Sequence, residues 1–281
     1  MYRRALVISG VLLLLAHPVF AQKLKRVWST EPVFKVPESV NYDPQKNVLI
    51  VSNINGKPSA KDGNGFLSLL SLDGKVLKLK WVSGLNAPKG AALVGRKLYV
   101  ADIDQVVVVD VERANIVKRI PFPQAGFLND VAADAHGTVY VSDTSGKNSV
   151  IYRLRDDKPE VWLRAPLVRN PNGLAVAGNT LYVGNTGDGT LLRVDLDTKR
   201  TSVVAKVGFG IDGLKPANRE GFVLSDWVGN VFFLKGNGTL VHLLKPTRKN
   251  VNAADIEYLS DRKLVLVPTF FDNRVVAYRL D

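Results

Sequence analysis

The chain has no cysteine, one methionine and three histidines among its 281 residues. Without cysteine it can form no disulfide, no thiolate nucleophile and no cysteine-ligated zinc site. His17 lies in the N-terminal apolar segment, His136 in a turn sequence and His242 in an expected outer strand. A histidine general base is therefore not expected near any shared site, and a soft metal is disfavoured there.

The only long apolar run lies at the N-terminus. Arg3 and Arg4 precede an apolar and small-residue stretch at 5–15, and residues 19–21 fit the small-x-small pattern of a cleavage site. The run is shorter than the roughly 20 residues that a transmembrane helix needs. We predict that residues 1–21 are a signal peptide and that the mature protein is periplasmic or secreted, without a membrane span. An uncleaved anchor is the alternative.

Positive charge exceeds negative charge, with a formal net charge of +12 that becomes +10 once Arg3 and Arg4 leave with the signal. Lysines and arginines alternate with apolar residues at 23–28 and 75–81, as in solvated edge strands, and do not cluster as a nucleic-acid footprint does. We therefore expect no nucleic-acid partner, and contacts with anionic surfaces or anionic solutes outside the cytoplasm.

A short phrase recurs through the mature chain, and five of its six copies begin with a polar residue. Successive copies are separated by 51, 40, 43, 40 and 42 residues. Their first residues are Glu38, Lys89, Asn129, Asn172, Asp212 and Ala254. Periods of about 40 to 50 residues that are rich in short strands are typical of β-propellers, in which each repeat forms one blade. Six copies predict an all-β, six-bladed propeller.

The second expected strand of each repeat is almost wholly apolar, at 48–51, 98–101, 139–142, 181–184, 222–225 and 264–267. Such runs, bounded by turns, fit strands that are buried between stacked blades. The sixth repeat ends with its third strand at 275–280, whereas residues 23–29 have the character of a fourth strand. We predict that this N-terminal strand closes the ring as the outer strand of the last blade. Residues 22–281 then form a single domain, which we take to be a monomer.

The first residues of the repeats converge on the central axis of such a fold. Glu38, Asn129, Asn172 and Asp212 then form an all-oxygen set with two negative charges. This set suits a hard divalent cation, calcium first, with magnesium, manganese and zinc as competitors. The competing interpretation is that each residue only caps a turn, as Asn and Asp often do. Four such residues at equivalent positions favour the metal site.

The loops that follow the second strands lie on the same face of the propeller as the axial residues. The loop residues that we expect to bind substrate there are Asn53, Asp102, Asp226, Trp227 and Phe270. Phe271 is expected to belong to the same wall. The longest of these loops, at 53–65, is polar and can act as a lid over the pocket.

Three motifs resemble the metal-ligand motifs of a known family. Glu38 in Val-Pro-Glu-Ser-Val, Asn172 in Asn-Pro-Asn-Gly-Leu and Asp212 in Ile-Asp-Gly-Leu look like the three metal ligands of the senescence marker protein, gluconolactonase and luciferin-regenerating enzyme family. Asn129 resembles that family's further polar residue beside the metal, and a fourth metal ligand in the related diisopropylfluorophosphatases and paraoxonases. The resemblance implies a six-bladed, metal-dependent hydrolase of small-molecule lactones or related esters.

Lys89 departs from the family's pattern because it brings a cation to the axis. It can bind an anionic substrate group, act as a base with a lowered pKa, or pair with Glu38 and Asp212 and so replace the metal. With a metal present, we expect Asp212 to act as the general base, and Lys89 or Asn129 to stabilise the oxyanion and contact the substrate. Two functions compete with the hydrolase: a non-catalytic periplasmic propeller that binds a small ligand or protein, and a scaffold that binds partners through its sides.

Overall fold

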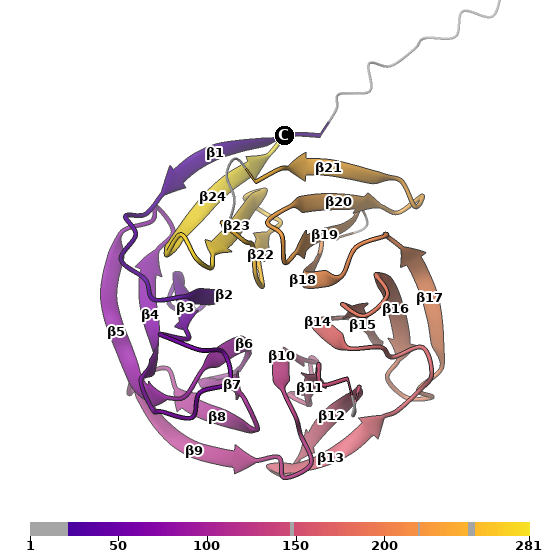
Figure 1. Ribbon diagram of the computed structural model, residues 1–281, viewed down its shortest axis with the longest axis horizontal. Coiled ribbons are helices and arrows are strands. Elements are labelled where there is room, and N and C mark those ends of the chain that lie inside the picture. The colour runs from indigo at the N-terminus through magenta and orange to yellow at the C-terminus, as the bar shows by residue number, and fades with distance from the viewer. Residues whose placement is uncertain (1–21, 147–148, 219, 247–250) are drawn as a thin grey trace, which may run out of the picture.

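The protein is a ring of six four-stranded antiparallel sheets, as the computed structural model shows for residues 22–146, 149–218, 220–246 and 251–281 (Figure 1). The predicted all-β, six-bladed propeller is therefore confirmed. The expected signal peptide, 1–21, lies outside the described residues. Across the described ranges, no helix has the length and hydropathy required to cross a bilayer.

Each blade is built from four consecutive strands, except the last. From the axis outward, the first three blades contain β2 (Pro37–Asp43), β3 (Val48–Asn53), β4 (Gly65–Ser71) and β5 (Val76–Leu85); β6 (Pro88–Val94), β7 (Lys97–Asp102), β8 (Gln105–Asp110) and β9 (Asn115–Pro121); and β10 (Leu128–Ala133), β11 (Val139–Asp143), β12 (Val150–Arg155) and β13 (Lys158–Leu163). The next two contain β14 (Pro171–Ala177), β15 (Thr180–Asn185), β16 (Thr190–Asp195) and β17 (Thr201–Lys206); and β18 (Ile211–Pro216), β19 (Gly221–Asp226), β20 (Val231–Lys235) and β21 (Leu240–Leu244).

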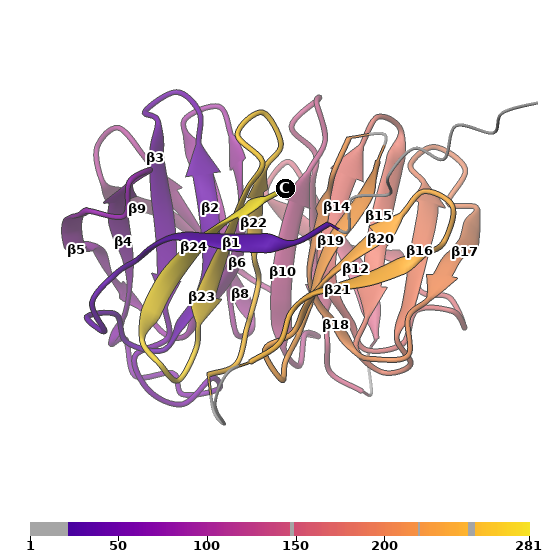
Figure 2. The same ribbon diagram turned by 90° about the horizontal axis from the view of Figure 1, so that it is seen from above.

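The N-terminal strand closes the ring, as predicted. The sixth blade has the order β22 (Glu257–Leu259), β23 (Leu264–Thr269), β24 (Arg274–Leu280) and β1 (Leu24–Ser29), so its outer strand comes from the opposite end of the chain. Strand β1 pairs antiparallel with β24, with Leu24 opposite Leu280. Figure 2 shows β1 crossing the outside of the yellow C-terminal strands. Pairing the two ends leaves no unclosed blade at the seam.

Six apolar clusters fill the six gaps between neighbouring blades. The middle strands supply both sides of each gap because successive side chains of a strand point to opposite faces. In β7, Leu98 and Val100 pack toward the first blade, whereas Tyr99 and Ala101 pack toward the third. This double burial explains why the second strand of every repeat is apolar throughout.

An irregularity in the innermost strands aims the leading side chains at the axis. In the first five blades the register between the first and second strands shifts near the start of the first strand, as between Pro88 and Ala91 or between Ile211 and Leu214. The leading residue of each repeat is the second residue of that strand and lies within this bulge. Because a β-bulge redirects the side chains of the bulged strand, the same distortion repeated five times orients five polar groups toward one place.

The sixth blade departs from the expected repeat. Its innermost strand has only three residues and starts at Glu257, so Ala254 precedes the strand. The backbone at Asp255 pairs with the first blade instead, because its N–H donates to Glu38 O at 2.9 Å and its C=O accepts from the N–H of Val40. The sixth repeat therefore contributes backbone contacts and an alanine near the axis, where the other repeats contribute polar side chains.

Candidate functional site

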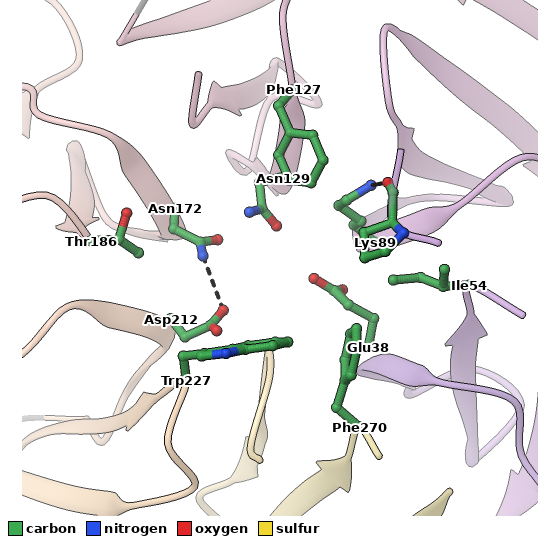
Figure 3. A pocket seen from close by; sticks show the side chains of 11 residues that line it. Glu38, Ile54, Lys89, Phe127, Asn129, Asn172, Thr186, Asp212, Trp227 and Phe270 are labelled. Atoms are coloured by element: carbon green, nitrogen blue, oxygen red, sulfur yellow. Dashed lines mark hydrogen bonds between the residues drawn. The ribbon is translucent and has the colours of Figure 1, made fainter. Parts of the chain in front are cut away.

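A pocket of about 330 Å³ lies at the axis, and eleven residues from all parts of the ring line it. Its lining includes the five polar leading residues, here called the axial ring: Glu38, Lys89, Asn129, Asn172 and Asp212. The other lining residues are Ile54, Pro58, Phe127, Thr186, Trp227 and Phe270. Figure 3 shows the side chains of Glu38, Asn129, Asn172 and Asp212 pointing toward a common centre. The structure therefore brings together the four residues that the sequence predicted as a metal site.

The four oxygen-bearing residues of the axial ring are buried but have few partners. Asn172 Nδ2 donates a hydrogen bond to Asp212 Oδ1 at 3.0 Å, which leaves the amide oxygen of Asn172 turned toward the centre (Figure 3). Glu38 Oε2 is buried and has no hydrogen-bond partner among the described residues. A buried carboxylate oxygen without a donor is energetically costly, so this atom calls for a positively charged or donating group that protein atoms do not supply.

The electrostatics of the axial ring point the same way. Burial raises the pKa of Glu38 well above its ordinary value, and the nearby Asp212 carboxylate raises it further. Burial also raises the pKa of Asp212 to about 7, although the hydrogen bond from Asn172 works in the opposite direction. Two acids that resist ionisation in one pocket are characteristic of a site whose charge is balanced by something that binds there.

The donor set fits a hard divalent cation. Glu38 and Asp212 supply carboxylate oxygens, Asn129 and Asn172 supply amide oxygens, and calcium and magnesium prefer such ligands. Among the residues that the structure describes, no group of three or more His, Cys, Asp or Glu side chains is arranged for a metal. The axial set contains only two side chains of these types, Glu38 and Asp212, because its other two members are amides. The unpartnered Glu38 oxygen and the all-oxygen chemistry support the fit.

Lys89 does not occupy the centre of the axial ring. Its Nζ donates to Pro58 O and to Ala87 O, both at 3.0 Å, and lies 4.4 Å from the centroid of the Phe127 ring. Among the described residues, Lys89 forms no ion pair with Glu38 or Asp212 within 4 Å, and the hydrogen bonds of its Nζ go to backbone carbonyls. Burial lowers the pKa of Lys89 to about 8, while Glu38 and Asp102 oppose that shift. With 1% exposure and three partners, the ammonium does not lie between the Glu38 and Asp212 carboxylates, as a replacement for a metal ion would, and it is not open to an anion.

The loop between β3 and β4 extends to the pocket. Ile54 and Pro58 line the cavity, and Lys89 is bonded to the Pro58 carbonyl. Lys61 forms an ion pair with Asp104, and the N–H of Gly63 donates to Asn86 Oδ1 at 3.2 Å. The predicted lid loop is thus fastened at three points to the second blade.

The residues that end the second strands have a different role from the one predicted. These six residues, here called the loop-anchoring ring, are Asn53, Asp102, Asp143, Asn185, Asp226 and Thr269, and all are buried. Each accepts at least one backbone N–H at 2.7 to 3.1 Å: from the segment before the blade for Asn53, Asp102, Asp143 and Asn185, from the following turn for Asp226, and from the start of β24 for Thr269. Asn53, Asp102 and Asp226 were expected to bind substrate, but they do not line the pocket. Because their oxygens are bonded to loop backbone, we correct that expectation to a structural role.

Sequence reasoning placed Trp227 and Phe270 in the pocket wall, and both line it. It missed Ile54, Pro58, Phe127 and Thr186, although Phe127 comes two residues before Asn129 and Ile54 directly follows a second strand. The positions of Ile54, Thr186 and Phe127 repeat between blades, but their residue types do not. These shared positions were the available signal, whereas Pro58 lies in a long loop that only the first blade has.

A second layer of buried charge lies one residue further along the repeats. Asp255 pairs with Lys215, with its Oδ2 3.6 Å from Nζ, and neither carboxylate oxygen has a hydrogen-bond partner among the described residues. Burial opposes the charge on Lys215, but Asp255, Glu257 and Asp130 outweigh it and raise the pKa of the lysine. The Asp130 carboxylate accepts the N–H groups of Val131 and Leu174 at 2.7 Å. Burial and the Asp130 carboxylate still raise the pKa of Asp255 well above its ordinary value, although Lys215 opposes them. This layer differs from the axial ring in that it contains an ammonium group paired with a carboxylate.

Comparisons with known proteins support the propeller fold. No protein-family model matches the chain, and a search of curated proteins finds no match. A structural genomics protein of unknown function from Bacteroides thetaiotaomicron is similar with a TM-score of 0.70 at 12% identity, over 93% of this chain and 76% of that chain. Virginiamycin B lyase from Staphylococcus aureus is similar with a TM-score of 0.66 at 10% identity, over 92% of this chain and all of that chain. Hydrazine synthase from Kuenenia stuttgartiensis gives a TM-score of 0.63 at 15% identity, over 84% and 74%. At such identities the similarity concerns the fold alone.

Proposed function

We propose that the protein is an exported, divalent-cation-dependent hydrolase of lactones or related esters, with calcium as the first candidate. The observation that carries the proposal is the convergence of four oxygen donors on the floor of a closed-ring pocket, where Glu38 Oε2 has no partner among the described residues. Glu38, Asn129, Asn172 and Asp212 would hold the cation. Bound there, the cation would supply positive charge that polarises an ester carbonyl and acidifies a nucleophilic water.

The chain's own residues would perform the remaining steps. Asp212, whose pKa burial raises to about 7, is suited to accept the proton of an attacking water. Asn172 fixes the orientation of that carboxylate through its 3.0 Å hydrogen bond to Oδ1. The Asn129 amide can donate to the oxygen that becomes negative during attack.

The competing function is a metal-free binding propeller in which Lys89 neutralises the carboxylates. That arrangement requires the ammonium between Glu38 and Asp212, whereas Lys89 Nζ is bonded to Pro58 O and Ala87 O. The hydrolase is therefore the function that the geometry supports best.

The proposal is tested with a panel of lactones and aryl esters, assayed with calcium and with a chelator. We expect hydrolysis that depends on the cation and that Asp212→Ala reduces by about 10²–10⁴-fold, the range typical of a lost general base. Equal rates with calcium and with chelator would contradict cation dependence. No hydrolysis of any substrate in the presence of calcium, magnesium, manganese or zinc would contradict the hydrolase.

A further inference from the structure

Above its charged floor, the axial pocket has apolar walls. Its lining there consists of Ile54, Pro58, Phe127, Trp227 and Phe270. Figure 3 shows Ile54, Phe127, Trp227 and Phe270 around the axial ring. Ile54 and Phe270 also belong to a buried apolar cluster behind the pocket, so the wall is a face of the protein core. A wall of this kind binds the apolar part of a ligand.

The polar groups in the wall are already engaged. Thr186 Oγ1 donates to Asn170 O at 2.8 Å, and Lys89 donates to two carbonyls. Among the eleven lining residues, Trp227 has one side-chain donor above the floor, its indole N–H, and this group makes no hydrogen bond to a described residue. A sugar lactone carries several hydroxyl groups, and each hydroxyl that enters such a wall unpaired loses affinity by about tenfold or more.

Charge also selects against anionic ligands. The Lys89 ammonium is buried against Phe127 and two carbonyl oxygens, so this lysine of the lining is not free to pair with an anionic group. An anionic substituent that enters the apolar wall would lose its hydration and meet no free cation among the wall residues. An uncharged ligand avoids this desolvation cost.

The apolar wall continues onto the surface as an aromatic rim, defined as Trp227, Val228 and Phe271. Trp227 is 46% exposed and Phe271 54% exposed. The two rings pack edge to face at 6.1 Å, and each also packs on Phe270, at 4.7 and 4.9 Å. Exposed large apolar side chains that adjoin a pocket mark a surface that binds apolar groups. The rim offers a place for a substituent that is too long for a cavity of about 330 Å³.

We propose that the substrates are uncharged lactones or esters that carry an aliphatic or aromatic substituent, and not sugar lactones. The reacting carbonyl lies at the axial ring, the ring or aryl group lies against the Trp227 and Phe270 side chains, and a longer substituent lies along the aromatic rim. This proposal rests on the hydrolase function given above, and it names the substrate class of the same pocket.

The test compares kcat/KM for δ-lactones with methyl, butyl and hexyl substituents, for phenyl acetate and for glucono-δ-lactone. We expect kcat/KM to rise with chain length, by up to about fourfold for each methylene group that is fully buried, and to be lowest for glucono-δ-lactone. Trp227→Ala removes most of this rise, Trp227→Phe retains it, and Leu77→Ala leaves it unchanged. Leu77 is a matched control because it is 49% exposed on the outer strand β5. Circular dichroism verifies that each variant is folded.

Three outcomes separate this proposal from the hydrolase on which it rests. Preference for glucono-δ-lactone, or a chain-length effect that survives Trp227→Ala in a folded variant, overturns the substrate class and leaves the hydrolase standing. If no compound is hydrolysed, the hydrolase falls and calorimetry with the intact hexyl lactone decides the ligand class. Binding that Trp227→Ala weakens at least tenfold then supports an apolar ligand, and no binding overturns it.

Discussion

The axial ring and the loop-anchoring ring are made of similar residues at regular positions of the same repeats, yet they differ in how their polar atoms are satisfied. The oxygens of Asp102 accept the N–H groups of Asn86 and Ala87 and the side-chain amide of Gln105. Among the described residues, Asp212 of the axial ring has one side-chain hydrogen-bond partner, Asn172, and Glu38 Oε2 has none. Repetition of polar residues therefore does not distinguish a binding site from a structural device. Between these two rings, the unfilled hydrogen-bonding capacity does.

Substitutions in the two rings should differ most in their effect on catalytic activity. Asp212→Asn keeps the shape of the side chain but removes the carboxylate that we propose as cation ligand and proton acceptor, so we expect hydrolysis to fall by about 10²–10⁴-fold. Asp226→Asn makes the same chemical change in the loop-anchoring ring, where the side chain holds the N–H groups of Gly229 and Asn230. Its specific activity, measured on folded protein, should remain within about threefold of wild type. Equal losses in the two variants would contradict the division between the rings.

Stability without a cation should change in opposite directions in the two rings. Asp102→Asn weakens three buried hydrogen bonds and should lower the free energy of unfolding by about 1–3 kcal/mol. Asp212→Asn removes a buried group that resists ionisation, so at pH 8 with chelator it should raise the stability. Urea unfolding of both variants measures the difference. A loss of stability in Asp212→Asn would show that the axial carboxylate is satisfied by the protein itself.

The pH dependence of the cation-free protein sharpens the same contrast. Because the folded-state pKa of Asp212 is about 7, against an ordinary value of 3.8, the folded protein holds a proton that the unfolded chain has lost between these values. The proton on Asp212 therefore stabilises the folded protein at low pH. This contribution to the free energy of unfolding is lost as the pH rises toward 7, with a slope of about 1.4 kcal/mol per pH unit from this group. Glu38 acts in the same direction. Thermal unfolding from pH 4 to pH 8 with chelator measures this fall, which Asp212→Asn should reduce and calcium should oppose.

The smallest expected effect concerns the fifth member of the axial ring. Lys89→Met keeps the apolar stem but removes the hydrogen bonds to Pro58 O and Ala87 O. We expect KM to rise severalfold with a smaller change in kcat, because the 54–64 loop loses one of its fastenings. Faster hydrogen exchange in this loop is the structural readout. A fall in kcat of about 10²-fold or more with KM unchanged would instead assign Lys89 to the chemistry.

Much of this architecture could be predicted from the sequence because the repeats carry it. The blade count, the buried second strands and the closing strand β1 follow from spacing and from the period-two alternation of side chains. The four convergent residues Glu38, Asn129, Asn172 and Asp212 follow from the same spacing. The short strand of the sixth blade did not follow, since it depends on the backbone pairing of Asp255 with the first blade.

The difference in hydrogen bonding between the two rings could not be predicted from the sequence, for a physical reason. Whether a polar side chain is free depends on where loop N–H groups lie, and local sequence does not fix that. Asp226 and Asp212 each follow a short apolar stretch, but only Asp226 meets a tight turn at Gly229 and Asn230. Lys89 is a similar case, because its partners Pro58 and Phe127 come from the first and third blades.

The central claim is that the axial ring holds one divalent cation. Its most direct test is a calorimetric titration of calcium into the chelator-treated protein, with Glu38→Gln as the variant and Glu112→Gln, which removes an exposed carboxylate, as the control. The account predicts one calcium site per chain in the wild type and in Glu112→Gln, and loss of that site in Glu38→Gln. Absence of binding in the wild type, for calcium and for magnesium, manganese and zinc alike, or binding that survives Glu38→Gln unchanged, would contradict it.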